Sequence, residues 1–261
     1  MPSLFVTGGA GYLGSELVRR ASGAGWEVTA TCLGNPPDVP AAWVRLDVRD
    51  GDAVAALIAE LRPDALIHTA YRQTGPDAWS TNVDGAETVA RAARGARLLH
   101  LSSDLVFDGR RGRYREEDVP APVSDYGRSK AEAEARVAAA HPGALLARTS
   151  LLYGGSRAGP QERLARAGGT FFVDEIRSPV DVGDLAEALL ELLALDVAGP
   201  LHLGGADDVS RHELALLLGA DPQRVRRGHT PSDRAPDVSL DSSRARALLR
   251  TRLRGVREVR G

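Results

Sequence analysis

A tyrosine and a lysine stand four residues apart in the segment 125–132, and this lysine, Lys130, is the only one in the chain. On a helix, residues four apart share a face, so the phenol of Tyr126 and the ammonium of Lys130 can point into one site. A nearby cation favours the phenolate form of a tyrosine. Because arginine is used everywhere else, this position is predicted to require a compact ammonium. The spacing alone is equally compatible with a lysine on the solvent-exposed surface of a helix.

The N-terminal segment has the pattern of a nucleotide-binding turn. An apolar run, 3–7, leads directly into glycines at positions 8, 11 and 14, and a helical pattern of apolar residues follows from Leu13. Glycines let a backbone approach a pyrophosphate closely, and the free N–H groups of a helix N-terminus favour its negative charge. The strand, turn and helix context predicts that a dinucleotide binds here.

The second strand, 27–32, should end beside the adenosine ribose, where NAD-preferring sites usually carry an acid. No acid occurs between Glu27 and Asp38, and the strand end has no arginine for a 2′-phosphate. The pattern favours NADP slightly and leaves NAD open. Further on, Asp47 could accept from the adenine amino group, or could instead cap a helix over 53–61.

The next elements lead to a candidate site for the carbonyl group that reacts. A strand over 65–68 runs into 69–71, and a helix over 77–93 contains Asn82. A strand over 97–101 ends at Ser102 and Ser103. In doubly wound sheets, ligands lie outside the carboxyl ends of the strands. Ser103 is therefore expected where a reacting carbonyl would lie.

Together these motifs resemble the extended short-chain dehydrogenase/reductases. The resemblance rests on the glycine turn, on Asp47, on Asn82 and on the Ser103, Tyr126 and Lys130 set. Three further segments are similar to the dTDP-4-dehydrorhamnose reductase branch, namely 101–109 with 126–130, 147–154, and 177–186. This resemblance implies an NAD(P)H-dependent reductase of a keto group, most simply on a nucleotide-linked 4-keto-6-deoxy sugar, with Tyr126 as proton donor and the cofactor as hydride donor.

The resemblance also assigns roles to individual residues. It implies catalytic roles for Ser103, Tyr126, Lys130 and Asn82, with Asn82 anchoring a water. It implies cofactor contacts, to NADP(H) or NAD(H), from Gly8, Gly11, Tyr12, Leu13, Gly14, Asp47, Val48, Thr69, Ala70, Tyr71, Tyr126 and Lys130. It implies substrate contacts from Ser103, Asp104, Leu105, Tyr126, Leu151 and Arg177.

Two residues depart from the branch pattern. Leu105 stands where a tyrosine is frequent and Leu151 where a tryptophan is frequent, which leaves another ketone or a differently decorated sugar nucleotide open. The same triad serves 4-epimerases. Dehydration is disfavoured because Leu105 occupies the place of the expected glutamate. A non-catalytic regulatory subunit that keeps the nucleotide site is a further alternative, disfavoured by the intact triad.

The order of elements predicts an α/β fold with a doubly wound parallel sheet and a small C-terminal lobe. We expect a Rossmann domain over 1–154 and a substrate-binding lobe over 155–261, partly packed on the sheet. In the lobe, helices are expected over 182–195 and 211–218, the second capped by Ser210. The stretch 219–236 should be loop-rich.

The composition limits the binding partners that can be expected. A net charge of -2 does not indicate binding to nucleic acid. The arginine-rich C-terminus is expected to be a solvated, frayed tail. One cysteine fits a reducing cytoplasm, and no apolar run approaches the roughly 18 residues of a membrane span. The histidines lack metal-ligand spacing, and His68 and His100 are expected to be satisfied core residues. A homodimer is left open.

Overall fold

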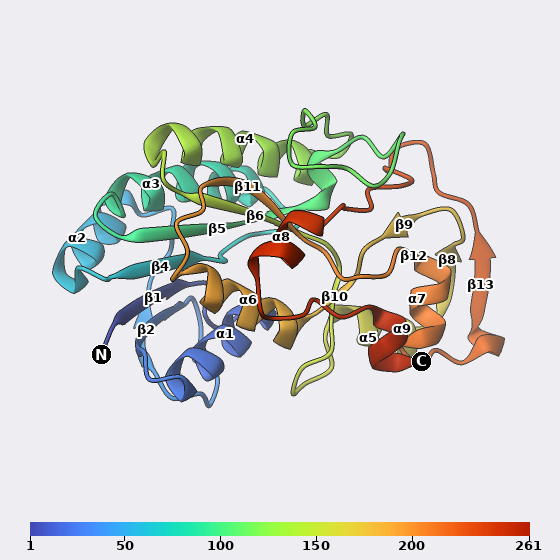
Figure 1. Ribbon diagram of the computed structural model, residues 1–261, viewed down its shortest axis with the longest axis horizontal. Coiled ribbons are helices and arrows are strands. Elements are labelled where there is room, and N and C mark those ends of the chain that lie inside the picture. The colour runs from blue at the N-terminus through green and yellow to red at the C-terminus, as the bar shows by residue number, and fades with distance from the viewer. The chain divides into compact units, whose positions relative to one another are not determined.

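Short apolar runs form a seven-stranded sheet in the computed structural model, which describes residues 1–261 (Figure 1). The strand order is β11-β6-β5-β4-β1-β2-β3. The bounds are β1 Ser3–Thr7, β2 Glu27–Cys32, β3 Ala42–Arg45, β4 Ala65–His68, β5 Arg97–Ser103, β6 Leu145–Thr149 and β11 Gly199–Leu203. Strands β1 to β5 pair in parallel. The order 3-2-1-4-5-6 is that of doubly wound nucleotide-binding folds, so the predicted fold class is confirmed.

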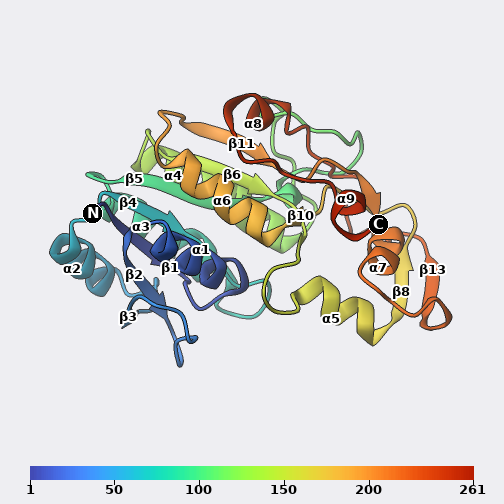
Figure 2. The same cartoon turned by 60° about the horizontal axis from the view of Figure 1, so that its bottom comes forward.

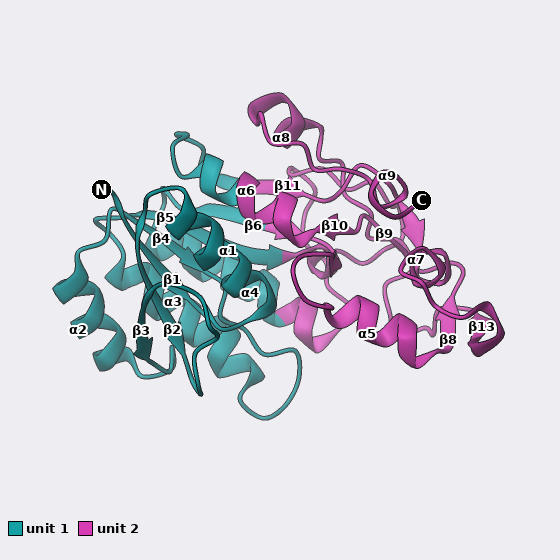
Figure 3. Cartoon of the chain, turned by 90° about the horizontal axis from the view of Figure 1, so that it is seen from below, with its two compact units in different colours: residues 1–102, 129–147, 189–200 teal, residues 103–128, 148–188, 201–261 magenta.

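The chain divides into two compact units that alternate along the sequence (Figure 3). Unit 1 contains residues 1–102, 129–147 and 189–200, and unit 2 contains residues 103–128, 148–188 and 201–261. The chain therefore passes from one unit to the other several times. The predicted division into a nucleotide-binding domain over 1–154 and a substrate lobe over 155–261 stays a prediction about function.

Unit 1 has helices on both faces of its strands (Figures 1 and 2). Its helices include α1 Tyr12–Gly23, α2 Gly51–Leu61, α3 Gly85–Ala92 and most of α4 Asp125–Ala140. Phe5, Leu66 and Leu98 of the sheet belong to one buried cluster with apolar residues of α2, α3 and α4. Helix α1 lies on the opposite face. Because the helices cover the two faces of the sheet, the loops that follow the strands lie at the carboxyl ends of the strands.

Unit 2 consists of short elements around a smaller core. Its elements are η2 Asp104–Val106, β7 Leu152–Tyr153, α5 Pro160–Ala167, β8 Gly169–Phe172, β9 Ile176–Arg177, β10 Val180–Asp181, most of α6 Val182–Leu192, β12 Val209–Ser210, α7 Arg211–Leu217, η3 Pro222–Arg224, β13 Val225–Gly228, α8 Ser243–Leu248 and α9 Val256–Arg260. Tyr153, Phe171 and Leu214 anchor the core. The Ser210 cap is confirmed, because its Oγ accepts from Glu213 N at 3.0 Å.

One expectation for the C-terminal part was confirmed and another was wrong. The stretch 219–236 is loop-rich, with the short turn η3 and one strand, β13, which pairs in parallel with β8. The basic end of the chain is not a frayed tail: Leu253 and Val256 are buried, and Arg254 donates to both carboxylate oxygens of Asp184, from Nη2 at 2.7 Å and from Nε at 2.9 Å. Buried leucine and valine between the arginines fix this segment, which a count of charges does not reveal. No helix in the structure combines the length and the hydrophobicity needed to cross a membrane.

Candidate functional site

The glycine turn between β1 and α1 is shaped by close backbone contacts. Gly8 has φ +70°, and its carbonyl accepts from Gly11 N at 2.9 Å. A Cβ on Gly8 would lie 2.7 Å from Ala70 N, and one on Gly14 would lie 2.3 Å from Gly8 O. A Cβ on Gly11 would meet only Gly8 O, at 3.1 Å. A Cβ would therefore be crowded by backbone at all three glycines, least at Gly11, and this shape fits the close approach of a pyrophosphate.

The residues expected to line the cofactor are gathered around this turn. Gly11 is the N-cap of α1, and no side chain caps the helix, so its first turn, with Tyr12 and Leu13, presents backbone N–H groups at the glycine turn. Thr69 Oγ1 donates to Thr7 O at 2.7 Å, which holds the segment after β4 against the end of β1. Tyr71, two residues later, is 54% exposed. Their contacts with a cofactor stay predictions.

Asp47 does not cap the following helix. Helix α2 begins at Gly51, and its cap is Asp50, whose Oδ1 accepts from Ala53 N at 3.0 Å. The Asp47 carboxylate accepts from the side chain and backbone of Arg49, and this hydrogen bonding lowers the pKa of Asp47. The neighbouring Val48 is buried. Of the two roles left open, the cap is excluded and the adenine contact stays a prediction.

Arg45 is a candidate that the sequence did not reveal. It ends β3 and is the register partner of Cys32, which ends β2 without an acid. Arg45 is exposed, whereas Arg49 pairs with Asp77 at 2.8 Å. Thirteen positions separate Cys32 and Arg45 in sequence, so only the pairing of the two strands brings this guanidinium to the edge where a 2′-phosphate would lie.

Asn82 is buried in a π-helical turn, Ser80–Asp84, rather than in the single helix expected over 77–93. Its Oδ1 accepts from Arg72 N at 2.8 Å. Its Nδ2 donates to Arg72 O and to Ser129 Oγ, both at 2.9 Å. The amide therefore joins the loop after β4 to helix α4, beside Lys130. Because both amide hydrogens are used, a water could be held only through Oδ1, and that role stays a prediction.

Lys130 is buried at the carboxyl end of β5. Its side chain is 3% exposed, and Nζ donates to Leu101 O at 2.5 Å. Burial lowers the pKa of Lys130 to about 8, while Glu134 one turn later acts in the opposite direction. Leu101 lies two residues before Ser103 in the same strand. The strand therefore fixes the ammonium close to the point where the serine leaves the sheet.

The two neighbouring histidines differ from expectation in one respect. His68 and His100 are buried and stacked, with ring centroids 5.2 Å apart. His68 Nδ1 lies 2.7 Å from Thr7 Oγ1, but His68 Nε2 and both ring nitrogens of His100 have no hydrogen-bond partner in the protein. Burial, together with the charge of Lys130, lowers the pKa of His68 to about 3 and that of His100 well below its usual value. Both histidines are core residues as expected, but the expectation that they are satisfied was wrong for His100 and holds for only one ring nitrogen of His68.

In unit 2, Gly127 brings Tyr126 close to the segment that follows Ser103. A Cβ on Gly127 would lie 2.2 Å from Leu105 O, so only glycine lets the first turn of α4 approach this carbonyl. Leu105 N in turn donates to Ser103 Oγ at 3.2 Å. Tyr126 is half-buried and shares helix α4 with Lys130. The glycine after the tyrosine, part of the segment 126–130 that carries the resemblance, thus has a steric reason.

The remaining substrate-side residues are internal to unit 2. Asp104 and Arg177 are each 3% exposed. Arg177 Nη2 donates to Glu175 and to Ala235 O, at 3.2 and 3.0 Å. Leu151 packs against the small core that contains Tyr153. Asp104 and Arg177 belong to a buried polar network. Contacts of Asp104, Arg177 and Leu151 with a substrate stay predictions.

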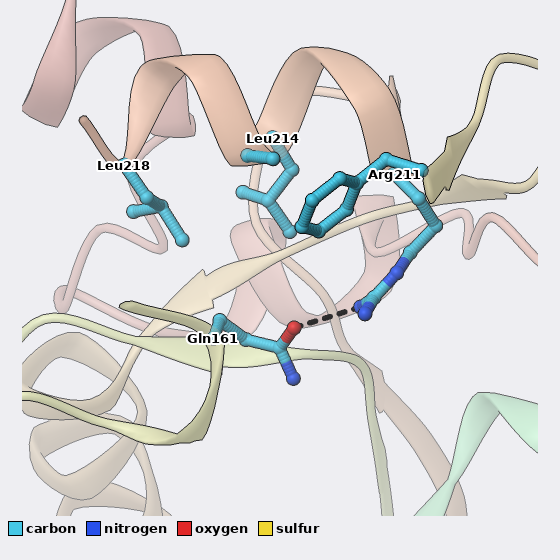
Figure 4. A pocket seen from close by; sticks show the side chains of 6 residues that line it. Gln161, Arg211, Leu214 and Leu218 are labelled. Atoms are coloured by element: carbon cyan, nitrogen blue, oxygen red, sulfur yellow. Dashed lines mark hydrogen bonds between the residues drawn. The ribbon is translucent and has the colours of Figure 1, made fainter. Parts of the chain in front are cut away.

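A small hollow opens elsewhere in unit 2 (Figure 4). It is lined by Gln161, Phe171, Arg211, Leu214, Ala215 and Leu218. Arg211 Nη1 donates to Gln161 Oε1 across it at 2.8 Å. Its volume of about 150 Å³ includes space open to solvent. Sites for drug-sized ligands usually enclose about 300–1,000 Å³, so this hollow is too small to hold a nucleotide sugar.

Comparison with known proteins places the chain in a family. Residues 2–254 match the family described as RmlD substrate binding domain. A dTDP-4-dehydrorhamnose reductase of Mycobacterium tuberculosis is 37% identical over 243 residues, which cover 85% of this chain and 78% of that protein. The methionine adenosyltransferase 2 subunit beta of Bos taurus is 29% identical over 282 residues, covering 94% of this chain and 82% of that protein.

A solved structure agrees with the sequence relatives. The crystal structure of a hypothetical dTDP-4-dehydrorhamnose reductase from Sulfolobus tokodaii has a TM-score of 0.82 and 32% identity, and the match covers 97% of each chain. These matches confirm the resemblance that the motifs predicted.

Proposed function

Because the chain belongs to the RmlD substrate-binding domain family, we propose that it reduces the 4-keto group of a nucleotide-linked 4-keto-6-deoxy sugar. Its class, an NAD(P)-dependent oxidoreductase, follows from that membership. The name of the Mycobacterium tuberculosis relative supports the sugar substrate. The observation that carries the proposal is helix α4, which bears Tyr126 and Lys130 one turn apart with the ammonium fixed on Leu101 O.

The glycine turn fits a dinucleotide, because an added Cβ would meet backbone atoms at Gly8 and Gly14 and would be crowded by Gly8 O at Gly11. In the proposed complex, the turn and the first N–H groups of α1 hold the pyrophosphate. Asp47 and the segment 69–71 flank the nucleosides, and Lys130 holds the nicotinamide ribose. The cofactor supplies the hydride when it is bound. NADPH is used at least as well as NADH, because β2 ends without an acid and Arg45 ends β3 beside it.

The proton chemistry belongs to the protein. Tyr126 donates its phenolic proton to the carbonyl oxygen of the sugar. Lys130 stabilises the phenolate that remains, since a nearby cation favours that form. Ser103 donates a hydrogen bond to the same oxygen and so stabilises the negative charge that develops on it. Leu105, two residues after Ser103, and Leu151, which follows Ser150, are proposed to contact the sugar.

The direct test is NADPH oxidation by the purified protein with dTDP-linked 4-keto-6-deoxyhexoses, followed by the loss of NADPH absorbance and by analysis of the sugar product. Net oxidation with formation of the 4-hydroxy sugar is expected. An epimerase would convert sugar nucleotides without net NADPH consumption. A regulatory subunit would bind NADPH and turn over none of the panel. Either of these results would refute the proposal.

A further inference from the structure

A buried hydrogen-bond network surrounds the hydroxyl of Ser103 in unit 2. Ser103 Oγ donates to Asp104 Oδ1 at 3.0 Å. The other carboxylate oxygen, Asp104 Oδ2, accepts from Ser150 Oγ at 2.6 Å. Leu105 N donates to Ser103 Oγ at 3.2 Å. The three side chains are all at least nine-tenths buried, so water competes little for these bonds.

These contacts determine how the serine can act. A hydroxyl has one hydrogen and two lone pairs. In Ser103 the hydrogen is directed at Asp104 and one lone pair receives Leu105 N–H, so a ketone oxygen to which Ser103 donates must share this single hydrogen with Asp104 Oδ1 in a three-centre bond. The position of Oγ and the side-chain rotamer are thereby fixed from two sides. A serine held in this way keeps a single orientation toward a ketone oxygen, whereas an unanchored serine would lose rotamer freedom on binding.

The carboxylate that holds Ser103 is itself anchored by charge. Arg177 Nε lies 3.9 Å from Asp104 Oδ2. Arg177 is held in turn by Glu175, which also accepts from Arg234 Nε and Nη2, each at 2.8 Å. Burial raises the pKa of Asp104, and the charge of Arg177 together with the two serine hydroxyls opposes that rise. Ser150 and Arg177 therefore fix the carboxyl group on the side away from Ser103.

We propose that Asp104 is a positioning residue, anchored by Ser150 and Arg177, which sets the hydroxyl of Ser103 for reduction of the ketone. This role rests on the proposed function, because it acts through Ser103 on the reacting carbonyl. It replaces the substrate contact expected for Asp104 from the sequence, since both carboxylate oxygens are used inside unit 2. Asp104 itself touches neither the sugar nor the cofactor.

A double-mutant cycle tests whether Asp104 acts through Ser103. Asp104→Ala should lower kcat by about 10- to 100-fold, the order of effect that misplacing a reacting group has. The KM for the sugar and the Kd for NADPH should change less than about threefold, and the far-UV circular dichroism should stay unchanged. In a Ser103→Ala background, Asp104→Ala should cost almost nothing further. Equal losses in the two backgrounds would overturn the proposal.

Two milder variants cover the case in which Asp104→Ala fails to fold. Asp104→Asn keeps an acceptor for Ser103 and should retain more activity than the alanine variant. Ser150→Ala removes one anchor and leaves Asp104 in place, so it should lower kcat by a smaller factor, and this loss should also vanish without Ser103. The control is Asp221→Ala, which removes an exposed carboxylate of unit 2 that accepts from Gln223 N. It should leave kcat unchanged.

A spectroscopic measurement separates this proposal from the proposed function. The side-chain carboxyl ¹³C resonance of Asp104, assigned by its loss in Asp104→Asn, should shift in Ser103→Ala and in Ser150→Ala. An unmoved resonance in Ser103→Ala would refute the Ser103–Asp104 bond even in an active enzyme. A wild-type protein that reduces no sugar would refute the proposed function, and the resonance would still decide whether Asp104 holds Ser103.

Discussion

The ammonium of Lys130 donates a 2.5 Å hydrogen bond to the carbonyl oxygen of Leu101, two residues before Ser103 in the same strand. This bond explains why the only lysine of an arginine-rich chain stands at this position. The side chain is 3% exposed, so the group must be compact enough to fit between helix α4 and strand β5. A guanidinium is planar and broader, and it cannot replace a point charge in this space.

Lys130→Arg should therefore inactivate the enzyme although the charge is kept. We expect kcat/KM to fall by about 10²-fold or more, because displacement of a catalytic group by about 1 Å has this effect. Lys130→Met should be at least as damaging, since the phenolate loses its cation. The matched control is Arg128→Lys on the same helix, where the exposed side chain pairs with Asp125. Steady-state kinetics in which Lys130→Arg equals the wild type would contradict the assignment.

Tyr126→Phe tests the proton donor. The substitution keeps the ring and its packing and removes the hydroxyl. General acids contribute about 10²–10⁴ in rate, so kcat should fall by that order. The affinity for NADPH, measured by fluorescence titration, should change little. If the phenylalanine variant turned over as fast as the wild type, another group would have to supply the proton.

Gly127→Ala tests the approach of helix α4 to Leu105. The added Cβ would lie 2.2 Å from Leu105 O and 3.0 Å from Pro122 Cβ, so the first turn of the helix must move. Forcing an extra methyl group into a packed site costs about 1–3 kcal/mol, and the displaced Tyr126 should lower kcat. The control is Gly23→Ala at the end of α1, where an added Cβ meets nothing within 4 Å. Denaturant unfolding and kinetics of both variants check this, and equal behaviour would exclude the steric argument.

Arg45→Ala tests cofactor preference. A hydrogen bond to a charged group contributes about 1.5–3 kcal/mol, so the variant should bind NADPH at least about tenfold more weakly. Binding of NADH, which lacks the 2′-phosphate, should stay unchanged. Direct titration with both cofactors measures this without turnover. Arg94→Ala is the control, because this exposed arginine precedes β5 at the opposite end of the strands. A parallel loss for both cofactors in Arg45→Ala would refute a 2′-phosphate contact.

The buried histidines predict loss of stability in acid. An unfolded histidine binds a proton near its ordinary pKa of about 6.5, whereas the pKa of His68 in the fold is lowered to about 3 and that of His100 is also strongly lowered. The unfolded chain therefore binds more protons below pH 6.5, and the free energy of unfolding decreases as the pH is lowered. His100→Phe should reduce the loss between pH 7 and pH 5 by about 2 kcal/mol.

Urea unfolding at the two pH values measures this difference. His229→Gln serves as the control, because His229 is an exposed histidine of unit 2. Its pH dependence should match that of the wild type. An unchanged pH dependence in His100→Phe would mean that His100 is protonated in the fold.

Local patterns in the sequence were sufficient for the nucleotide end and for helix α4. The need for glycine at positions 11 and 14 reflects contacts with Gly8 and Gly9 within a few residues, and the four-residue spacing of Tyr126 and Lys130 is a property of one helix. Alternating strands and helices predicted the doubly wound sheet. Such signals survive in sequence because the atoms that interact are close along the chain.

Tertiary structure decided the surroundings of these motifs. The pairing of β2 with β3 brings Arg45 beside Cys32, and the fold gathers Asp104, Ser150 and Arg177 around one hydroxyl. Asp104 and Arg177 are 73 positions apart, and no periodicity relates them. The sequence by itself determined which groups can do the chemistry. Their partners depend on burial and on long-range contacts, which form only when the chain packs, and so only the folded structure specifies how each group is held.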